Sequence, residues 1–176
     1  MDRTVDEQTQ IRKGTKTVAG DPVLLAASTG LRTEALHFQT AAAEEFWDIT
    51  EFVRDVVVRS QVKHGQVTIY TPHTTTTIVI NESETGFLND YRRIIDRLVP
   101  VDDYYEHDDH DVRTENLQED EFLNGHAHVR QLLIGNASAT VPIVDGELLL
   151  GQWQRVLYGE LDQARERRVF VHVQGV

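Results

Sequence analysis

One polar, β-prone stretch, residues 71–84, constrains this chain more than any other: T-P-H-T-T-T-T-I-V-I-N-E-S-E. Successive side chains of a strand point to opposite faces of a sheet, so His73, Thr75 and Thr77 are expected to share one face. Glu82 follows where this strand ends, and the ends of rigid elements often carry binding and catalytic groups. The stretch therefore predicts a strand that delivers a polar site.

Three helices are predicted, because apolar residues recur in them with the helical period. The best defined spans residues 48–65, with Asp48 as the capping residue at its start and Gly65 as its stop. The others span residues 86–98 and 124–134. The expected buried side chains of the last helix are Val129, Leu132 and Leu133.

Short β-prone segments alternate with these helices. Strands are expected at residues 35–40, 66–70, 73–80, 138–144, 148–158 and 167–174. The dipeptide Asp145-Gly146 is a strong hairpin signal between two of them. Residues 1–33 show no clear period and are predicted to form a flexible N-terminal extension.

The composition excludes several classes of function. The net charge of −12 disfavours nucleic acid and anionic membranes as partners, and its simplest explanation is solubility. Lysine occurs only at positions 13, 16 and 63, and this Arg-rich, acidic pattern also favours a halophilic origin, because high salt screens the repulsion. No stretch is apolar enough to span a membrane and no signal peptide is recognisable, so we expect a cytoplasmic protein. The absence of cysteine excludes disulfides and thiolate catalysis.

Two further segments carry histidines. They are Y-E-H-D (105–108) and N-G-H-A-H (124–128). The first lies in residues 101–121, a carboxylate-rich loop of a length that is commonly functional, and its carboxylates could hold a divalent cation. On a helix, His126 and His128 point in different directions, so at most one of them reaches a given site. We expect the three histidine segments to converge on one polar site.

Taken in order, these segments resemble the YjbQ-like family, described as secondary thiamine-phosphate synthase. The matching segments are residues 73–84 with Asp90, then 105–108, 124–128, 132–135, 142–154, 159–160 and 167–169. The resemblance implies an α+β fold, in which residues 34–176 form a single domain of mixed β-sheet structure with about three helices, and a homotrimer. It also implies a reaction that joins an aminopyrimidine diphosphate to a thiazole phosphate, giving thiamine phosphate and pyrophosphate.

The family's matching histidines are His73, His107 and His128. Each alone is explained as well by local hydrogen bonding. Together they match a known zinc arrangement, in which three histidines leave one position open. We therefore expect a divalent metal ion, zinc or magnesium, that activates water or polarises a phosphoryl oxygen.

Other side chains are candidates for the remaining roles. The candidate catalytic residues are Glu82, Asp90 and Gln154. Glu82 is better placed than Asp90 to orient a histidine or to act as a base. Thr75 and Thr77 could donate to a substrate phosphate, and Arg168 could bind its oxygens in a bidentate way, although an exposed strand arginine is an equal explanation.

The sequence leaves three functions open. One is an enzyme that acts on a small phosphorylated substrate, with thiamine-phosphate synthesis as the implied reaction. A metal-dependent phosphoesterase or hydrolase is the rival chemistry, because His, Glu and Arg around a metal serve both. The third is a non-catalytic trimer that binds a small anion or a metal ion.

Overall fold

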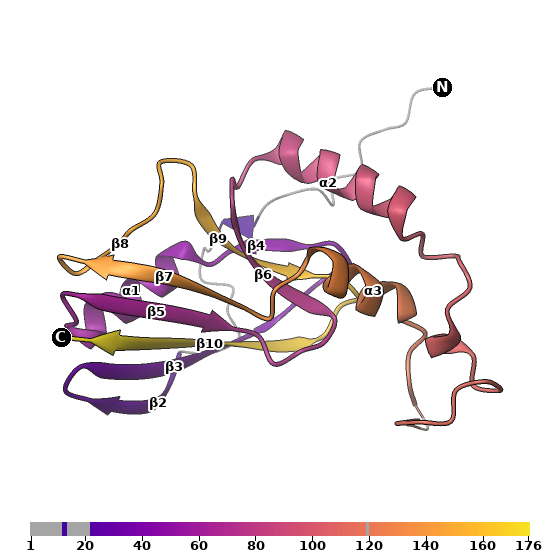
Figure 1. Cartoon of the computed structure of the whole chain (residues 1–176), viewed down its shortest axis with the longest axis horizontal. Coiled ribbons are helices and arrows are strands. Elements are labelled where there is room, and N and C mark those ends of the chain that lie inside the picture. The colour runs from indigo at the N-terminus through magenta and orange to yellow at the C-terminus, as the bar shows by residue number, and fades with distance from the viewer. Residues whose placement is uncertain (1–11, 14–21, 119) are drawn as a thin grey trace.

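The computed structural model describes residues 12–13, 22–118 and 120–176 (Figure 1). Its strands are β1 (Arg12–Lys13), β2 (Val23–Ser28), β3 (Leu31–Gln39), β4 (Phe46–Asp48), β5 (Gly65–Tyr70), β6 (Thr76–Asn81), β7 (Ser138–Val144), β8 (Glu147–Leu148), β9 (Arg155–Glu160) and β10 (Glu166–Gly175). Its helices are α1 (Thr50–Ser60), α2 (Thr85–Leu98), α3 (Gly125–Ile134) and the 3₁₀ helix η2 (Glu106–Asp108).

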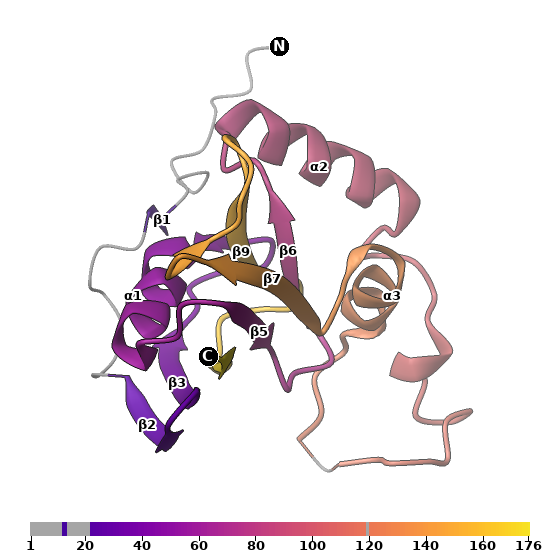
Figure 2. The same ribbon diagram turned by 60° about the vertical axis from the view of Figure 1, so that its left-hand side comes forward.

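The strands form two sheets. The larger has the order β2-β3-β10-β5-β7-β8 and is antiparallel, and the smaller has the order β1-β4-β9-β6. Among the described strands, only the pairing of β1 with β4 is parallel. Helix α1 lies at one side of the sheets, whereas α2 and α3 lie at the other (Figure 2). The predicted α+β fold with three helices is confirmed.

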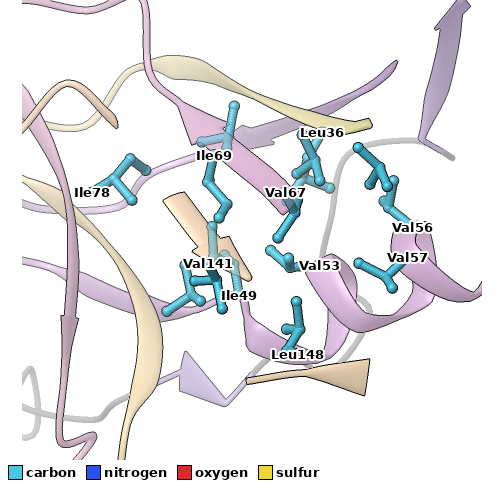
Figure 3. Close-up of a cluster of buried hydrophobic side chains, with 14 of the residues drawn as sticks. Leu36, Ile49, Val53, Val56, Val57, Val67, Ile69, Ile78, Val141 and Leu148 are labelled. Atoms are coloured by element: carbon cyan, nitrogen blue, oxygen red, sulfur yellow. The ribbon is translucent and has the colours of Figure 1, made fainter. Parts of the chain in front are cut away.

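Helix α1 closes the main core. Its inward side chains Val53, Val56 and Val57 pack against Val67 and Ile69 of β5, with the valines aimed at the sheet (Figure 3). The carboxylate of Asp48 accepts hydrogen bonds from the backbone N–H and the hydroxyl of Thr50 at the start of the helix. The apolar stripe predicted for this helix is therefore the face that holds the fold together.

The predicted end of this helix was wrong. The helix stops at Ser60, and Gln61 follows in the left-handed region with a φ of 62°. Gly65 instead opens β5, where a Cβ would lie 2.2 Å from the backbone oxygen of Gln174 on β10. Glycine is needed at this position because two strands approach each other closely there. A glycine that ends a helix looks the same in the sequence, which explains the wrong prediction.

The predicted buried side of α3 was also wrong. Leu132 and Leu133 are 82% and 62% exposed, whereas the buried residues of α3 are Gly125, His126, Ala127 and Arg130. The Arg130 guanidinium donates to the backbone oxygen of Val99 and pairs with Asp96 and Glu44. A buried guanidinium must keep such partners. The face of α3 that carries Arg130 is therefore turned inward, and the leucines on its other face are exposed.

Two other segments differ from expectation. Residues 23–28 form β2, which pairs with β3, so this part of the predicted flexible extension belongs to the sheet. Residues 1–11 and 14–21 of that extension lie outside the described residues. The predicted strand of residues 148–158 is divided into β8 and β9 by a loop in which Trp153 is 66% exposed.

The remaining strand predictions hold in outline. Residues 138–144 form β7, and Asp145 and Gly146 both have positive φ in the turn that leads to β8, as the hairpin signal predicts. Within the part of the chain that the structure describes, none of the helices has both the length and the apolar character needed to cross a membrane.

Candidate active site

A cavity of about 1000 Å³ opens where β6 begins and where β9 and β10 are connected. Its cationic and titratable side chains include His73, His107, His128, Arg113, Arg165 and Arg167. They come from four segments: the turn before β6, the loop around η2, the first turns of α3 and the start of β10. The three histidine segments therefore converge on one polar cavity.

His107 and His128 are direct neighbours. Their ring centroids lie 4.4 Å apart, with the ring planes tilted by 34°. Burial lowers the pKa of His128, and the adjacent His107 lowers it further, because two cations at this distance repel each other. His126 is buried elsewhere, 6.3 Å from the ring of Tyr105, and does not line the cavity. The two-residue spacing separates these side chains as predicted.

Asp108 fixes both members of the pair. Its carboxylate lies 3.1 Å from Nδ1 of His107 and accepts the backbone N–H groups of Asn124 and Gly125, each at 2.9 Å. It thus satisfies free N–H groups at the start of α3, the helix that carries His128. Glycine is required at 125, because a Cβ there would lie 2.6 Å from the Cβ of Tyr105.

His73 lies in the turn before β6, whereas a strand position was predicted. Its Nε2 accepts the backbone N–H of Arg168 at 3.2 Å, so the neutral ring carries its proton on Nδ1. Burial lowers the pKa of His73 to about 4, helped by the charges of Arg167, Arg168 and Arg165. His73 is therefore uncharged near neutral pH.

The floor of the cavity is a buried ion pair. Arg167 donates from Nε and Nη2 to Glu160 at 2.6 and 2.7 Å, and from Nη2 to the Thr75 hydroxyl at 3.2 Å. The Thr40 hydroxyl and the backbone N–H of Asp162 also donate to Glu160. Both charges are thus fully paired, which makes the floor rigid.

Arg165 is the guanidinium with the most spare capacity. Its Nη2 pairs with Asp162 at 2.8 Å, and the group lies 4.7 Å from the ring centroid of Phe122. Its Nε is buried and has no hydrogen-bond partner among the described residues. A buried, unpaired N–H is costly, so Arg165 has unused hydrogen-bonding capacity beside the cavity.

The outer wall is the polar loop before α3. Arg113 ties this loop together by donating to the backbone oxygens of His107, Glu115 and Asn116 and to the Glu121 carboxylate at 2.8 Å. Its charge lowers the pKa of Glu121, which therefore stays ionised. The carboxylates that suggested a cation site are thus partly neutralised by an arginine, which sequence analysis did not single out.

The predicted three-histidine metal site does not fit this arrangement. Among the described residues, no group of three or more histidines or carboxylates lies in a position to hold a metal ion. The Nε2 of His73 already faces the N–H of Arg168, and a ligating nitrogen needs its lone pair free. We derive no chemical step through a metal.

Several predicted site residues lie away from the cavity in this chain. Glu82 and Asp90 are exposed, and Asp90 pairs with Arg93 on its own helix. Gln154 is exposed and accepts the backbone N–H of Gly151. They lie beyond the far end of β6, whose six residues separate its two ends by roughly 17 Å.

Of the three predicted phosphate-binding residues, one lines the cavity and two do not. Thr75 reaches the cavity, but Thr77 is buried and bonds the backbone of Asn136. Arg168 is exposed with its guanidinium over Phe170, and its neighbour Arg167 enters the cavity instead. The signal was present in the sequence: Val169, Val171 and Val173 alternate on β10, which turns Arg167 inward and Arg168 outward. These valines are all buried.

Comparison with known proteins gives a consistent result. Residues 34–176 match the family model of the UPF0047 protein YjbQ-like family. A UPF0047 protein of Archaeoglobus fulgidus is 42% identical over 136 residues, 77% of this chain and 96% of that protein. A UPF0047 protein of Bacillus subtilis is 30% identical over 145 residues, 81% of this chain and 98% of that protein.

Solved structures share the fold. A YbjQ-like protein of unknown function from Sulfolobus solfataricus superimposes with a TM-score of 0.69 at 29% identity, covering 83% of this chain and 99% of that chain. An uncharacterized protein of the yjbq/upf0047 family from Clostridium acetobutylicum gives 0.67 at 32% identity, covering 78% of this chain and 96% of that chain. The chain described here belongs to the UPF0047 YjbQ-like family.

Proposed function

We propose that the cavity is the active site of an enzyme that acts on a small phosphorylated substrate. The observation that carries this proposal is that three arginines and three histidines line one cavity of about 1000 Å³, which four carboxylates, Glu106, Glu115, Asp120 and Glu121, also line. Guanidinium groups suit phosphate, because their N–H groups match its oxygens.

The side chains divide into two roles. Arg165 lines the cavity with an unpaired donor and would bind the phosphoryl oxygens, whereas Arg113 is committed to Glu121 and to backbone oxygens and would hold the loop. His107 and His128 would move a proton to or from the substrate, because their rings lie side by side at the cavity. His73, which is uncharged, would donate a hydrogen bond from Nδ1. Arg167 is committed to Glu160 and would act as a fixed positive charge below the ligand.

The family resemblance suggests the finer reaction. We propose thiamine-phosphate synthesis, in which an aminopyrimidine diphosphate joins a thiazole phosphate and releases pyrophosphate. Negative charge grows on the leaving diphosphate as its bond to carbon breaks, and preorganised guanidinium groups stabilise such charge. The cavity supports this proposal by placing Arg165, Arg167 and three histidines around one space.

The assay is release of pyrophosphate from the two substrates, with the purified full-length chain. We expect turnover in the wild-type protein and a loss of about 10²-fold or more in His128→Gln, the scale of a lost acid–base group. Arg54→Gln is the matched control, since Arg54 lies on α1 away from the lining of the cavity and forms ion pairs with Glu51 and Glu147. Phosphate release from one substrate alone would favour a phosphoesterase, and ligand-induced stabilisation without turnover would favour a binding protein.

Three further expectations are separate proposals with their own measurements. Metal content of the purified protein tests for the expected zinc or magnesium ion, for which the described residues offer no ready set of ligands. Light scattering tests the proposed homotrimer, which the exposed leucines of α3 support as an apolar contact surface. The dependence of unfolding on KCl concentration tests the halophilic origin. A homotrimer could also bring Glu82 or Gln154 of a neighbouring copy to the cavity.

A further inference from the structure

A second cavity, lined by two arginines, lies at the end of β10, whereas the histidine cavity lies at its start. Its volume is about 820 Å³, and it is bounded by the turn between β2 and β3, the C-terminal end of α1 and the end of β10. Its charged side chains are Arg32 and Arg59. It shares no lining residue with the histidine cavity.

The carboxylate that these arginines contact, Glu34, lies at a position where the alternation of core residues predicts an apolar side chain. On β3, Leu36 and Phe38 face the core, and Glu34 lies two residues before Leu36 on the same face. Glu34 is only 2% exposed. Replacing such buried charges by apolar residues is often neutral or stabilising, so stability alone does not account for a charge cluster here.

The two arginines converge on this carboxylate. Arg59 donates from Nε and Nη2 to the two Glu34 oxygens at 2.9 and 2.6 Å, and Arg32 donates from Nε at 2.5 Å. Burial alone would raise the pKa of Glu34, but the hydrogen bonds from Arg59 and Arg32 keep it below its usual value. Two guanidinium groups thus meet one carboxylate, and Asp55 adds a further negative charge near Arg59.

Spare donors remain on both arginines. Among the described residues, neither terminal nitrogen of Arg32 has a hydrogen-bond partner, and nor has Nη1 of Arg59. Arg32 is 19% exposed and Arg59 39%, so both are held at the cavity and still reachable. The turn beside them is fixed: Gly30 accepts the backbone N–H of Gly175 at 2.9 Å and has a φ of 74°.

We propose that this cavity is a second anion-binding site, in which Arg32 and Arg59 bind the oxoanion of a small molecule, a phosphate or a carboxylate. Glu34 is the positioning residue, because its carboxylate holds the guanidinium groups of Arg32 and Arg59 in place. The cavity is much larger than one oxoanion, so the ligand carries an organic part that lies along the turn between β2 and β3. This site is independent of the proposed function of the histidine cavity.

Site-resolved NMR tests the proposal with the full-length protein. Inorganic phosphate and acetate are titrated separately, at ionic strength matched with chloride, while the backbone amides of Gly30 and Gln61 are followed. We expect saturable shifts at these amides with at least one of the two anions, and the effective anion identifies the class. Binding at the histidine cavity is read separately from the amides of His107 and His128.

The variants are Arg32→Gln and the control Arg54→Gln. Arg32→Gln should weaken the response at Gly30 about tenfold or more, the effect of losing charge-assisted hydrogen bonds. Arg54→Gln should leave it unchanged. The proposal is overturned if Gly30 and Gln61 respond to neither anion beyond the chloride control, or if Arg32→Gln binds as tightly as the wild type. The wild-type titration decides the matter alone if Arg32→Gln does not fold.

Discussion

The two ends of β6 differ in what surrounds them. At its first residue, Thr76, the chain is buried beside a histidine and a paired guanidinium, whereas past its last residue, Asn81, Glu82 is exposed to solvent. The sequence makes both ends look alike, because polar residues flank the strand on each side. The difference arises from tertiary partners: β10 and the segment after α3 donate hydrogen bonds to Thr75 and Thr77 at the first end. Sequence proximity to a candidate residue is thus a poor guide to a site when a strand intervenes.

The largest effect is expected from the buried ion pair at the first end. Arg167→Met leaves the Glu160 carboxylate, which is fully buried, without its main partner, and should lower the free energy of unfolding by about 3–5 kcal/mol. Urea denaturation measures it. Glu82→Gln, the matching change at the second end, should stay within about 0.5 kcal/mol. Equal losses in the two variants would remove the contrast between the ends.

A smaller effect is expected on ligand binding. Arg165→Gln removes a guanidinium that lines the cavity and should weaken pyrophosphate binding about 10- to 100-fold, with little change in fold, because its partner Asp162 keeps a bond from Asn124. Calorimetric titration gives the affinity. Arg155→Gln, near the second end of β6, should bind as the wild type does. An unchanged affinity in Arg165→Gln contradicts the assignment of the cavity.

The pH dependence of stability should report His73. Its pKa falls from 6.5 in the unfolded chain to about 4 in the folded protein, so between these values the unfolded chain binds more protons. Stability from this group is complete above pH 6.5 and is lost as pH falls toward 4. His73→Gln should flatten the decrease by about 1–2 kcal/mol, with allowance for solvent screening. An identical pH profile in chemical denaturation would show that His73 titrates normally.

The smallest effect concerns the carboxylate that links η2 to α3. Asp108→Asn keeps the shape of the side chain but loses its charge at the α3 N-terminus, and should cost about 1 kcal/mol. The signals of His107 and His128 should broaden or move together, because Asp108 fixes both. Asp103→Asn, an exposed residue of the same loop, serves as the control. Equal stability and equal histidine signals in the two variants would show that Asp108 does not position His107 and His128.

Local rules predicted much of the fold and one part of the site. The period of α1 and the hairpin at Asp145-Gly146 depend on neighbouring residues only, and both are found. The exposure of Leu132 and the burial of Arg130 depend on Glu44 and Asp96 in distant segments, which no local pattern contains. Long-range ion pairs therefore decided which face of α3 turned inward.

The candidate site shows the same division. The histidine segments were recognisable because each carries its own polar pattern. Arg113 and Arg165 were not, because their importance comes from what the loop and β10 bring beside them. Arg167 is intermediate, since the alternation of valines on β10 marks it as inward-facing. The alternation of residues along β10 therefore favours Arg167 over Arg168 as the inward-facing arginine.

The most direct test of the account is a titration with inorganic pyrophosphate in which the histidine side chains are followed by NMR. Five histidines lie outside the cavity, and His37 and His64 among them are exposed. We predict that His73, His107 and His128 shift along one saturable curve while His37 and His64 stay in place. Histidine signals that all drift together, or cavity histidines that do not move, would contradict the conclusion that this cavity is the functional site.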